Sequence, residues 1–168
     1  MRIEFKYAQH QDLPQITDIY NQAIPGRQAT ADLEPVTVAS KEAWFAAFTP
    51  DKYPIWLIMV DGNIAGWVSL EAFYGRPAYS HTAEISIYLD QHYQHQQLGQ
   101  AALDFVFSQL PHLALDTIVA FVFHHNGPSQ HLFTRNGFDR WGHLPRVALM
   151  DGQRRDLDIL GRHFGKNM

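Results

Sequence analysis

Apolar residues recur along this chain with two spacings, one typical of strands and one typical of helices. Alternating or continuous apolar runs predict strands over residues 2–7, 53–60, 64–70, 84–89, 115–123, 138–150 and 157–161. Helical spacing predicts helices from residue 12 up to Pro25, over 40–48, from 98 to about 109, and a short one that contains Leu132 and Phe133. Strands and helices in this order are typical of a mixed α/β architecture.

Polar residues, proline and glycine mark the expected ends of these helices. Asp12 and Ser40 are the predicted N-caps of the first two helices, and the third is expected to end before Pro111. Asn126 is suited to cap the last helix, and Gly137 suits the left-handed position after its end.

Segments without periodicity are expected to be turns or loops. Residues 61–63 have the composition of a tight turn that pairs the strands on either side, and 151–153 form a turn between the closing strands. Residues 26–38 are expected to form a longer loop. Because loops carry much of the recognition in enzymes, we expect substrate contacts there.

The stretch from residue 84 to residue 103 combines a strand, a polar loop and the start of a helix at Leu98. Backbone N–H groups at a helix start point outward with the positive end of the helix dipole, which makes a ready site for phosphate. Glu84 places a carboxylate at the upstream end of the same strand. The stretch therefore predicts a phosphate cradle with a candidate base beside it, and a supersecondary unit without a ligand is the alternative.

Composition and charge narrow the class of protein. The chain has 168 residues, 46% of them hydrophobic, which fits one compact domain over residues 1–168. Its formal charge is −4 and it has no basic block, so we expect no nucleic-acid partner. No apolar run approaches the roughly 20 residues that span a bilayer, and the first residues lack the apolar core of a signal peptide, so we expect no membrane partner. With no cysteine there is no thiol nucleophile, and a soluble cytoplasmic protein is the default expectation.

Short segments stand at characteristic spacings along the chain, namely Ile19-Tyr20-Asn21, Leu33-Glu34-Pro35, Gly66-Trp67-Val68-Ser69, Glu84-Ile85-Ser86-Ile87-Tyr88-Leu89, Asn126-Gly127-Pro128-Ser129 and Gly137-Phe138. In this order they resemble the GNAT superfamily of N-acetyltransferases, and within it the phosphinothricin acetyltransferase group of small amino-acid N-acyltransferases. The resemblance covers about residues 3–164. It implies a mixed, mostly antiparallel seven-stranded sheet that is splayed at its centre and flanked by helices, with acetyl-CoA between two strands. It also implies a homodimer, because relatives commonly form dimers.

Glu84 is the candidate general base. Amide formation from a thioester needs the amine as its free base, and an ammonium with a pKa of about 9 to 10 must first lose its proton. A carboxylate that acts directly or through water can accept that proton, and the resemblance places the proposed general base at this position. It also implies that the backbone of Ile87, Tyr88 and Leu89 holds the pantetheine arm and polarises the thioester carbonyl. The alternative is that Glu84 only faces solvent or pairs with Arg76.

The phosphate loop departs from the superfamily pattern, which is Gln or Arg, two residues, Gly, one residue, and Gly or Ala. Counted from the strand, Gln94 takes the first position, Gln97 stands where the first Gly belongs, and Gly99 takes the second. A register shifted by two residues matches the residue types of the pattern, but it adds two residues before the helix begins. Gln97 puts a side chain where backbone must approach pyrophosphate, which costs affinity or needs a compliant backbone angle. No Lys or Arg lies between Arg76 and Arg135, so backbone amides are expected to bind most of the phosphate. The cofactor-binding residues implied in this loop are Gln94, Gln97, Leu98, Gly99, Gln100 and Ala101.

Asn126, Ser129 and Phe133 complete the implied contacts with acetyl-CoA. In relatives the Asn hydrogen-bonds the pantetheine arm, and Asn126 can cap its helix at the same time. Many members carry Tyr at the position of Phe133 to protonate the leaving thiolate, and phosphinothricin acetyltransferases often carry His. Phe can do neither, and His131 lies about 200° around the helix. We expect slower catalysis but not its loss, because water can protonate a thiolate.

Arg76 and Tyr79 resemble the residues that bind the substrate's carboxylate in this group, a task for which a guanidinium fork is well shaped. The alternative is a surface Arg paired with an acid, and Arg27 is a weaker second candidate for the same role. The chain has ten histidines, but His124 and His125 point to opposite faces of an extended segment, and His92, His95 and His131 lack the spacing of metal ligands. No metal site is predicted.

Two functions remain open at this point. The first is transfer of an acetyl group from acetyl-CoA to the primary amine of a small amino-acid-like substrate of the phosphinothricin or methionine sulfone type. The second is a catalytically weak or degenerate member that acts as an acyl-CoA sensor or interaction protein. This alternative is suggested by Gln97 and Phe133, which depart from the family pattern.

Overall fold

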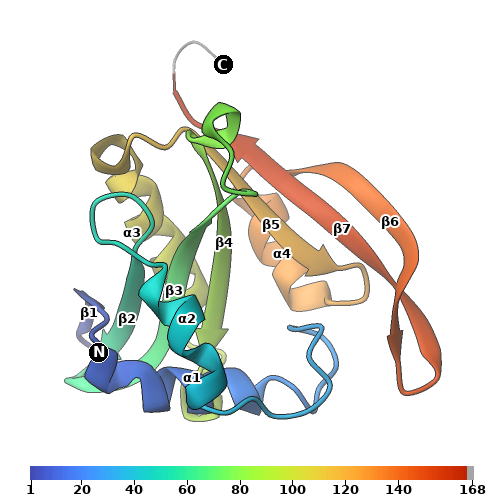
Figure 1. The fold of residues 1–168 in the computed structure, drawn as a ribbon, viewed down its shortest axis with the longest axis horizontal. Coiled ribbons are helices and arrows are strands. Elements are labelled where there is room, and N and C mark those ends of the chain that lie inside the picture. Colours follow the sequence, from blue (N-terminus) through green and yellow to red (C-terminus); the bar gives the residue numbers. More distant parts are fainter. Residues whose placement is uncertain (166–168) are drawn as a thin grey trace.

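A computed structural model describes residues 1–165 and shows a seven-stranded sheet with helices on both faces (Figure 1). The mixed α/β fold predicted from the sequence is confirmed. The helices are α1 (Leu13–Gln22), α2 (Glu42–Ala46), α3 (Leu98–Leu113) and α4 (Gly127–Arg135), with short 3-10 turns η1 (His10–Asp12), η2 (Ala39–Lys41), η3 (Pro77–Tyr79) and η4 (Gln91–Tyr93). The strands are β1 (Ile3–Tyr7), β2 (Ile55–Val60), β3 (Asn63–Ala72), β4 (Thr82–Leu89), β5 (Thr117–Phe123), β6 (Asp139–Met150) and β7 (Gln153–His163).

The sheet is splayed between its two parallel strands. Its order is β1-β2-β3-β4-β5-β7-β6, and every neighbouring pair is antiparallel except β4 with β5. These two strands pair only from Thr82 with Thr117 to Glu84 with Val119. Beyond Glu84 they diverge, as the green and gold arrows in Figure 1 show. The splayed centre implied by the resemblance is therefore present.

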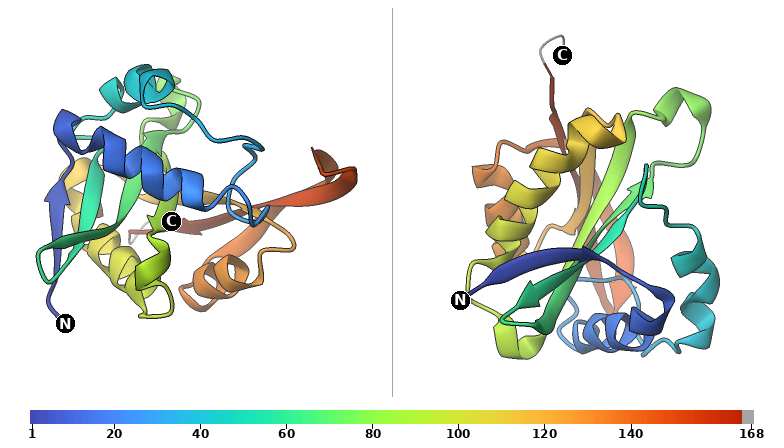
Figure 2. Two further views of the ribbon diagram at one scale, coloured as in Figure 1. Left: turned by 90° about the horizontal axis from the view of Figure 1, so that it is seen from below. Right: turned by 90° about the vertical axis from the view of Figure 1, so that its left-hand side faces the viewer.

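Helices cover both faces of the sheet and bury two apolar clusters (Figure 2). On one face α3 places Leu103 and Val106 against the sheet, where Ile58 is fully buried. On the other face α1 packs Ile16 against Leu57. Successive residues of β2 thus face opposite clusters, which explains why this strand is a continuous apolar run instead of an alternating one.

Two predicted helix caps are wrong, because a 3-10 turn precedes each of these helices and moves the exposed N–H groups upstream. The Asp12 carboxylate accepts a hydrogen bond from the backbone N–H of Gln9 at 2.8 Å, so it closes η1 and does not cap α1. Ser40 lies within η2, where its backbone N–H donates to the hydroxyl of Thr37 at 3.1 Å, and the N-cap position of α2 is taken by Lys41 without a side-chain cap.

The third helix passes Pro111 and ends at Leu113, which corrects the predicted end near residue 109. Leu110 and Leu113 are 2% and 4% exposed, and their burial offsets the hydrogen bond that proline cannot make. The ammonium of Lys52 donates to the carbonyls of Leu113 and Ala114 at 3.1 and 3.0 Å, which satisfies the free carbonyls of the helix end.

Other local predictions are confirmed. Asp61 and Gly62 both have positive φ, at 50° and 84°, as the tight turn between β2 and β3 requires. The Asn126 side chain accepts a hydrogen bond from the Ser129 backbone N–H at 3.3 Å and caps α4. Gly137 follows α4 with a φ of 84°. Of the helices in residues 1–165, none has both the length and the apolar character to cross a membrane.

Candidate active site

Glu84 lies where the two central strands part. It is the last residue of β4 that pairs with β5, and on its other side it pairs with Glu71 of β3. Partial burial, with a smaller contribution from the negative charge of Glu71, raises the pKa of Glu84 to about 7. Within residues 1–165, the ion pairs include none between Glu84 and Arg76. A carboxyl group that titrates near neutral pH is suited to proton transfer.

A residue of α2 holds the Glu71 side chain, which lies beside Glu84 on the neighbouring strand. The indole N–H of Trp44, on α2, donates to the Glu71 carboxylate at 2.8 Å. The negative charge of Glu71 opposes ionisation of Glu84. Sequence reasoning missed Glu71 because its position opposite Glu84 depends on the register between strands. The only local signal was its place directly after a predicted strand.

The residues beyond Glu84 present an open strand edge. Ile87, Tyr88 and Leu89 pair with β3, but the pairing of β4 with β5 ends at Glu84. Apart from the Leu89 carbonyl, which accepts a long hydrogen bond from Gln94, the backbone groups on this side are not used in strand pairing and can bind an extended ligand, as the pantetheine arm of acetyl-CoA is. On the paired side, Gly66 permits the close approach of β3 to β4, because a Cβ at that position would lie 2.5 Å from the carbonyl oxygen of Tyr88.

The predicted 26–38 loop joins the two arms of the splayed sheet. From β4, the Tyr88 hydroxyl donates to a backbone carbonyl of the loop at 3.0 Å. From the β5 side, His125 Nε2 and Asn126 Nδ2 donate to the loop's carbonyls at 2.7 and 3.2 Å. The three accepting residues are Arg27, Gln28 and Ala29. The loop thus connects β4 to the segment after β5 through these three hydrogen bonds.

Tyr20 fastens the same loop to α1. Its hydroxyl hydrogen-bonds with the Thr30 hydroxyl at 2.5 Å and donates to the Asp32 carboxylate. Burial and the hydrogen bond to Asp32 raise the pKa of Tyr20 to about 12, so the phenol stays neutral. Its ring packs edge-on against Tyr88 at 5.1 Å between centroids. Tyr20 and Thr30 were not among the predicted site residues, because they meet only through the fold of the loop.

The guanidinium of Arg27 is occupied by contacts within the protein, which argues against Arg27 as the weaker candidate for binding the substrate's carboxylate. Its guanidinium donates to both carboxylate oxygens of Asp151 at 2.9 and 3.4 Å. It also donates to the carbonyls of Ile24 and Leu33 at 3.2 and 2.8 Å. These contacts tie the 26–38 loop to the tip of the β6–β7 hairpin.

The loop before α3 has the backbone shape that the missing glycine would supply. Gln97 has a φ of 61°, in the left-handed region, and immediately precedes the helix. The first hydrogen bond of α3 runs from the N–H of Ala101 to the carbonyl of Gln97, at 3.2 Å. The N–H groups of residues 98–100 are therefore left without helical acceptors, as expected at a helix start. Gln97 therefore adopts the positive φ that glycine would adopt easily at this position.

The side chains of this loop mostly serve packing. A Cβ on Gly99 would lie 3.0 Å from the Leu132 side chain, so Gly99 permits the contact between α3 and α4. Gln100 and Asn136 exchange two amide hydrogen bonds of 2.8 Å, which also join these helices. Gln94 donates to the Leu89 carbonyl at 3.5 Å. Phosphate binding here would rest on backbone N–H groups, as predicted.

The predicted residues around α4 lie close together. Asn126 is 7% exposed and uses its side chain both to cap α4 and to hold the 26–38 loop. Ser129 donates its backbone N–H to that cap. Phe133 is 6% exposed, and its ring lies 5.0 Å from that of Phe138. This aromatic packing offers no proton donor for a thiolate.

Arg76 and Tyr79 line an open depression of about 680 Å³ at the end of the sheet where β4 begins. The segment follows β3 and precedes β4, so it lies toward the same end of the sheet as Glu84 (Figure 1). Tyr79 is 44% exposed, and its ring packs edge-on against Phe73 at 5.3 Å. The depression is lined by Tyr74, Arg76, Pro77, Ala78 and Tyr79.

Comparison with known proteins connects this geometry to one family. The sequence pattern of the acetyltransferase (GNAT) family matches residues 13–138. A Bacillus subtilis (strain 168) protein, named provisionally as phosphinothricin acetyltransferase YwnH, is 44% identical over 95% of this chain and 98% of its own. An L-methionine sulfoximine/L-methionine sulfone acetyltransferase of Pseudomonas paraeruginosa (strain PA7) is 33% identical over 89% of this chain and 87% of its own.

Solved structures agree with these relatives. A crystal structure named provisionally as a phosphinothricin N-acetyltransferase superposes with a TM-score of 0.94, at 42% identity over 98% of this chain and 100% of its own. A GNAT superfamily phosphinothricin acetyltransferase from Sinorhizobium meliloti, in complex with acetyl-CoA, superposes with a TM-score of 0.90. It is 25% identical over 98% of this chain and 90% of its own.

Proposed function

This chain belongs to the GNAT family of acetyltransferases, and we propose that it moves an acetyl group from acetyl-CoA to the primary amine of a small amino-acid-like molecule. The names of its relatives, which refer to phosphinothricin, methionine sulfoximine and methionine sulfone, support an acceptor of that type. The observation that carries the proposal is Glu84, a carboxyl group of raised pKa at the point where the central strands part.

Glu84 is the proposed general base. With a pKa of about 7 it is largely ionised at slightly alkaline pH and can accept a proton from the substrate's ammonium group, directly or through water. The N–C bond then forms as the C–S bond of the thioester breaks. The leaving thiolate takes its proton from water, because Phe133 offers no acidic group at the position where relatives carry one.

Backbone groups are proposed to hold acetyl-CoA. The open edge of β4 at residues 87–89 suits the pantetheine arm and would offer a backbone N–H donor to the thioester oxygen. The free N–H groups at the start of α3, after Gln97, suit the pyrophosphate. Asn126 and Ser129 border the same opening from α4, and Asn126 must share its side chain with the 26–38 loop if it also contacts the pantetheine.

Arg76 and Tyr79 are proposed to bind the substrate's carboxylate. The guanidinium of Arg76 lines an open depression, and the ion pairs of residues 1–165 do not include it. It can therefore offer a bidentate fork to an acid group. Tyr79 supplies a hydroxyl and an aromatic wall beside it.

One assay tests the proposal. Free CoA thiol is measured after acetyl-CoA is mixed with phosphinothricin, methionine sulfone, methionine sulfoximine, other amino acids or a polyamine. We expect release that depends on the amine and is fastest with the first three acceptors. Release only with polyamines would overturn the acceptor class. Acetyl-CoA binding without amine-dependent release would favour a sensor, an alternative that the names of the relatives do not support.

We also propose a cytoplasmic homodimer. The edge strand β6 exposes four large apolar side chains by 39% to 54%, and an exposed apolar edge strand is suited to pair with a second chain. Sedimentation analysis tests this, with Val147→Asp as the variant expected to give monomers. The exposed residues are Trp141, Leu144, Val147 and Leu149. The absence of cysteine from the sequence is compatible with a reducing compartment.

A further inference from the structure

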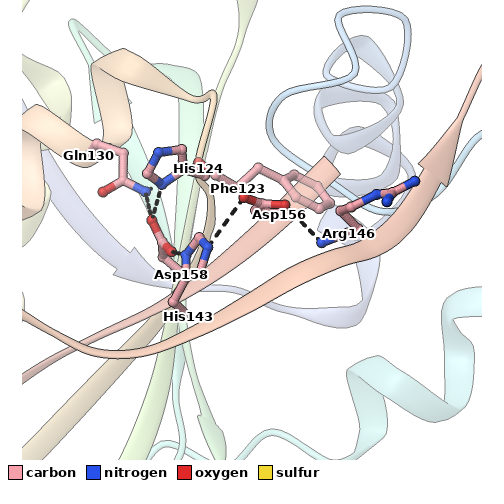
Figure 3. Close-up of polar contacts among 7 residues, drawn as sticks. All are labelled: Phe123, His124, Gln130, His143, Arg146, Asp156 and Asp158. Atoms are coloured by element: carbon pink, nitrogen blue, oxygen red, sulfur yellow. Dashed lines mark hydrogen bonds and ion pairs between the residues drawn. The ribbon is translucent and has the colours of Figure 1, made fainter. Parts of the chain in front are cut away.

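Two histidines and two aspartates meet where β5, β6 and β7 lie side by side next to α4 (Figure 3). His124 directly follows β5, His143 is on β6, and Asp156 and Asp158 are on β7. His143 and Asp158 are direct register partners across the two strands. The four residues have no regular ligand spacing along the chain, because they converge only through the sheet register.

Asp158 is the centre of this cluster. Its side chain is 1% exposed, and each of its two carboxylate oxygens faces one imidazole. Nδ1 of His124 lies 2.9 Å from one oxygen, and Nδ1 of His143 lies 2.5 Å from the other. One ligand atom from each of His124, His143 and Asp158 falls within 4.8 Å of the other two. Two imidazole nitrogens and a carboxylate in such proximity form a donor set typical of zinc and related ions.

A second carboxylate fixes the orientation of His143. Nε2 of His143 lies 3.2 Å from an oxygen of Asp156, so this ring has a carboxylate at each nitrogen. The other oxygen of Asp156 accepts the backbone N–H of Arg146 at 2.7 Å. Arg146 has a φ of 56° and lies in the irregular part of the β6–β7 pairing, between Leu144 and Ala148. The bulge in β6 thus holds the carboxylate that orients the imidazole.

Gln130 fixes the orientation of Asp158 in the same way. Its side-chain amide, on α4, donates to the Asp158 carboxylate at 3.0 Å and to the Phe123 carbonyl at 3.2 Å (Figure 3). Carboxylates and amides that hold the ligands from behind are typical of metal sites, where they set the direction of each ligand's lone pair. The cluster therefore has an inner group of three possible ligands and an outer group, Asp156 and Gln130, that orients them.

We propose that His124, His143 and Asp158 bind one divalent transition-metal ion, with Zn²⁺ as the reference ion. Binding uses the Nδ1 lone pair of His143, so its ring proton resides on Nε2, where Asp156 accepts it. Zn–N and Zn–O bonds of about 2.0 to 2.1 Å place ligand atoms about 3.3 Å apart in a tetrahedron. The three ligand atoms lie within 4.8 Å of one another, and the Nδ1 contacts of 2.9 and 2.5 Å are made to different oxygens of Asp158. Small side-chain rotations must therefore bring both nitrogens and one carboxylate oxygen to that separation. His124 is 56% exposed, which leaves the solvent side open for water as a further ligand.

The site would also stiffen the region that borders the proposed acetyl-CoA opening. His124 immediately precedes His125 and Asn126, whose side chains hold the 26–38 loop. A metal ion would cross-link the end of β5 to β6 and β7 at this point. We therefore expect metal binding to raise the melting temperature, because the ion binds the native state.

The test uses the full chain with any affinity tag removed and residual metal stripped by a chelator. Calorimetric titration with Zn²⁺ should give one ion per chain, and Co²⁺ should give the visible absorption of a low-symmetry site. His124→Gln and His143→Gln should each weaken Zn²⁺ binding by about tenfold or more, and Asp156→Asn should weaken it by about tenfold through the loss of orientation. His124 is an exposed residue at a strand end, so its replacement should leave the fold intact.

The matched control is His112→Gln, which removes an exposed imidazole on the last turn of α3 and should leave Zn²⁺ binding unchanged. No stoichiometric binding of Zn²⁺ or Co²⁺ by the native chain would overturn the proposal and leave a hydrogen-bonded network only. Binding that survives both histidine substitutions would also overturn it. Neither result bears on acetyl transfer, because Glu84 and the acetyl-CoA opening do not share a residue with this cluster.

Discussion

Replacement of Glu84 by Gln tests both the chemistry and the electrostatics of the site. Gln has nearly the same shape but cannot take a proton, so kcat/KM at pH 8 should fall by about 100-fold, within the usual range for loss of a general base. In the native enzyme, kcat/KM should rise with pH through an inflection near the Glu84 pKa of about 7. The variant should lose this acidic limb and keep only the dependence that comes from the amine itself.

The same substitution should change stability in a pH-dependent way. Burial raises the pKa of Glu84 from 4.5 to about 7, so the folded chain holds its proton more tightly than the unfolded chain does. The native protein therefore loses stability as pH rises from 4.5 to 7, and the loss is complete above 7. The difference corresponds to at most about 3 kcal/mol, and solvent screening at this half-buried position reduces it to about 1 to 2 kcal/mol.

Urea unfolding at pH 5 and pH 8 measures this effect. From pH 5 to pH 8, the free energy of unfolding of Glu84→Gln should rise by about 1 to 2 kcal/mol relative to that of the native chain. Glu4→Gln, a strand residue at the far edge of the sheet, serves as the control and should show no such gain. An acidic limb that persists in Glu84→Gln would refute its role as the base. An equal stability difference at both pH values would refute the raised pKa.

Three further changes test the rest of the site. Glu71→Gln removes the negative neighbour of Glu84 and should move the acidic limb of the pH profile to lower pH; an unmoved limb would contradict their coupling. Gln97→Gly should stabilise the fold by about 1 kcal/mol in urea unfolding, because Gly adopts a φ of 61° without strain. Gln94→Gly, where φ is −72°, should give no such gain, and equal effects would rule out backbone strain as the cause. Arg76→Lys should raise KM for the amino acid by about tenfold with KM for acetyl-CoA unchanged, because the bidentate fork is lost; a parallel rise in both KM values would place Arg76 outside the acceptor site.

Local chemistry made much of the fold predictable. The turn at Asp61 and Gly62 and the cap at Asn126 depend on residues close in sequence, and both are present. The wrong caps at Asp12 and Ser40 come from 3-10 turns that have no strong sequence signal. The predicted end of the third helix before Pro111 was wrong because the burial of Leu110 and Leu113, a tertiary effect, extends α3 past the proline.

The candidate site was predictable where it lies on one strand or one helix start. Glu84 and the loop at Gln97 belong to a single continuous stretch, and their order along the chain was enough to place them. Glu71 reaches Glu84 only through the register of β3 on β4, and the histidine cluster at Asp158 depends on three strands. Contacts of this kind are set by strand pairing, which a single sequence does not specify.

The glycines near the site show which requirements of the cofactor opening are steric and which are conformational. At Gly66 a Cβ would lie 2.5 Å from the backbone carbonyl oxygen of Tyr88, so any side chain there would force a strand to move. At Gly99 a Cβ would lie 3.0 Å from the end of the Leu132 side chain, which can shift to make room. At Gln97 the need is only for a positive φ, which costs a residue with a side chain about 1 to 2 kcal/mol. A fold of ordinary stability tolerates that cost but not a displaced strand. The chain therefore keeps glycine where space is lacking and departs from the family pattern where only a backbone angle is required, so the loop before α3 keeps its shape without its glycine.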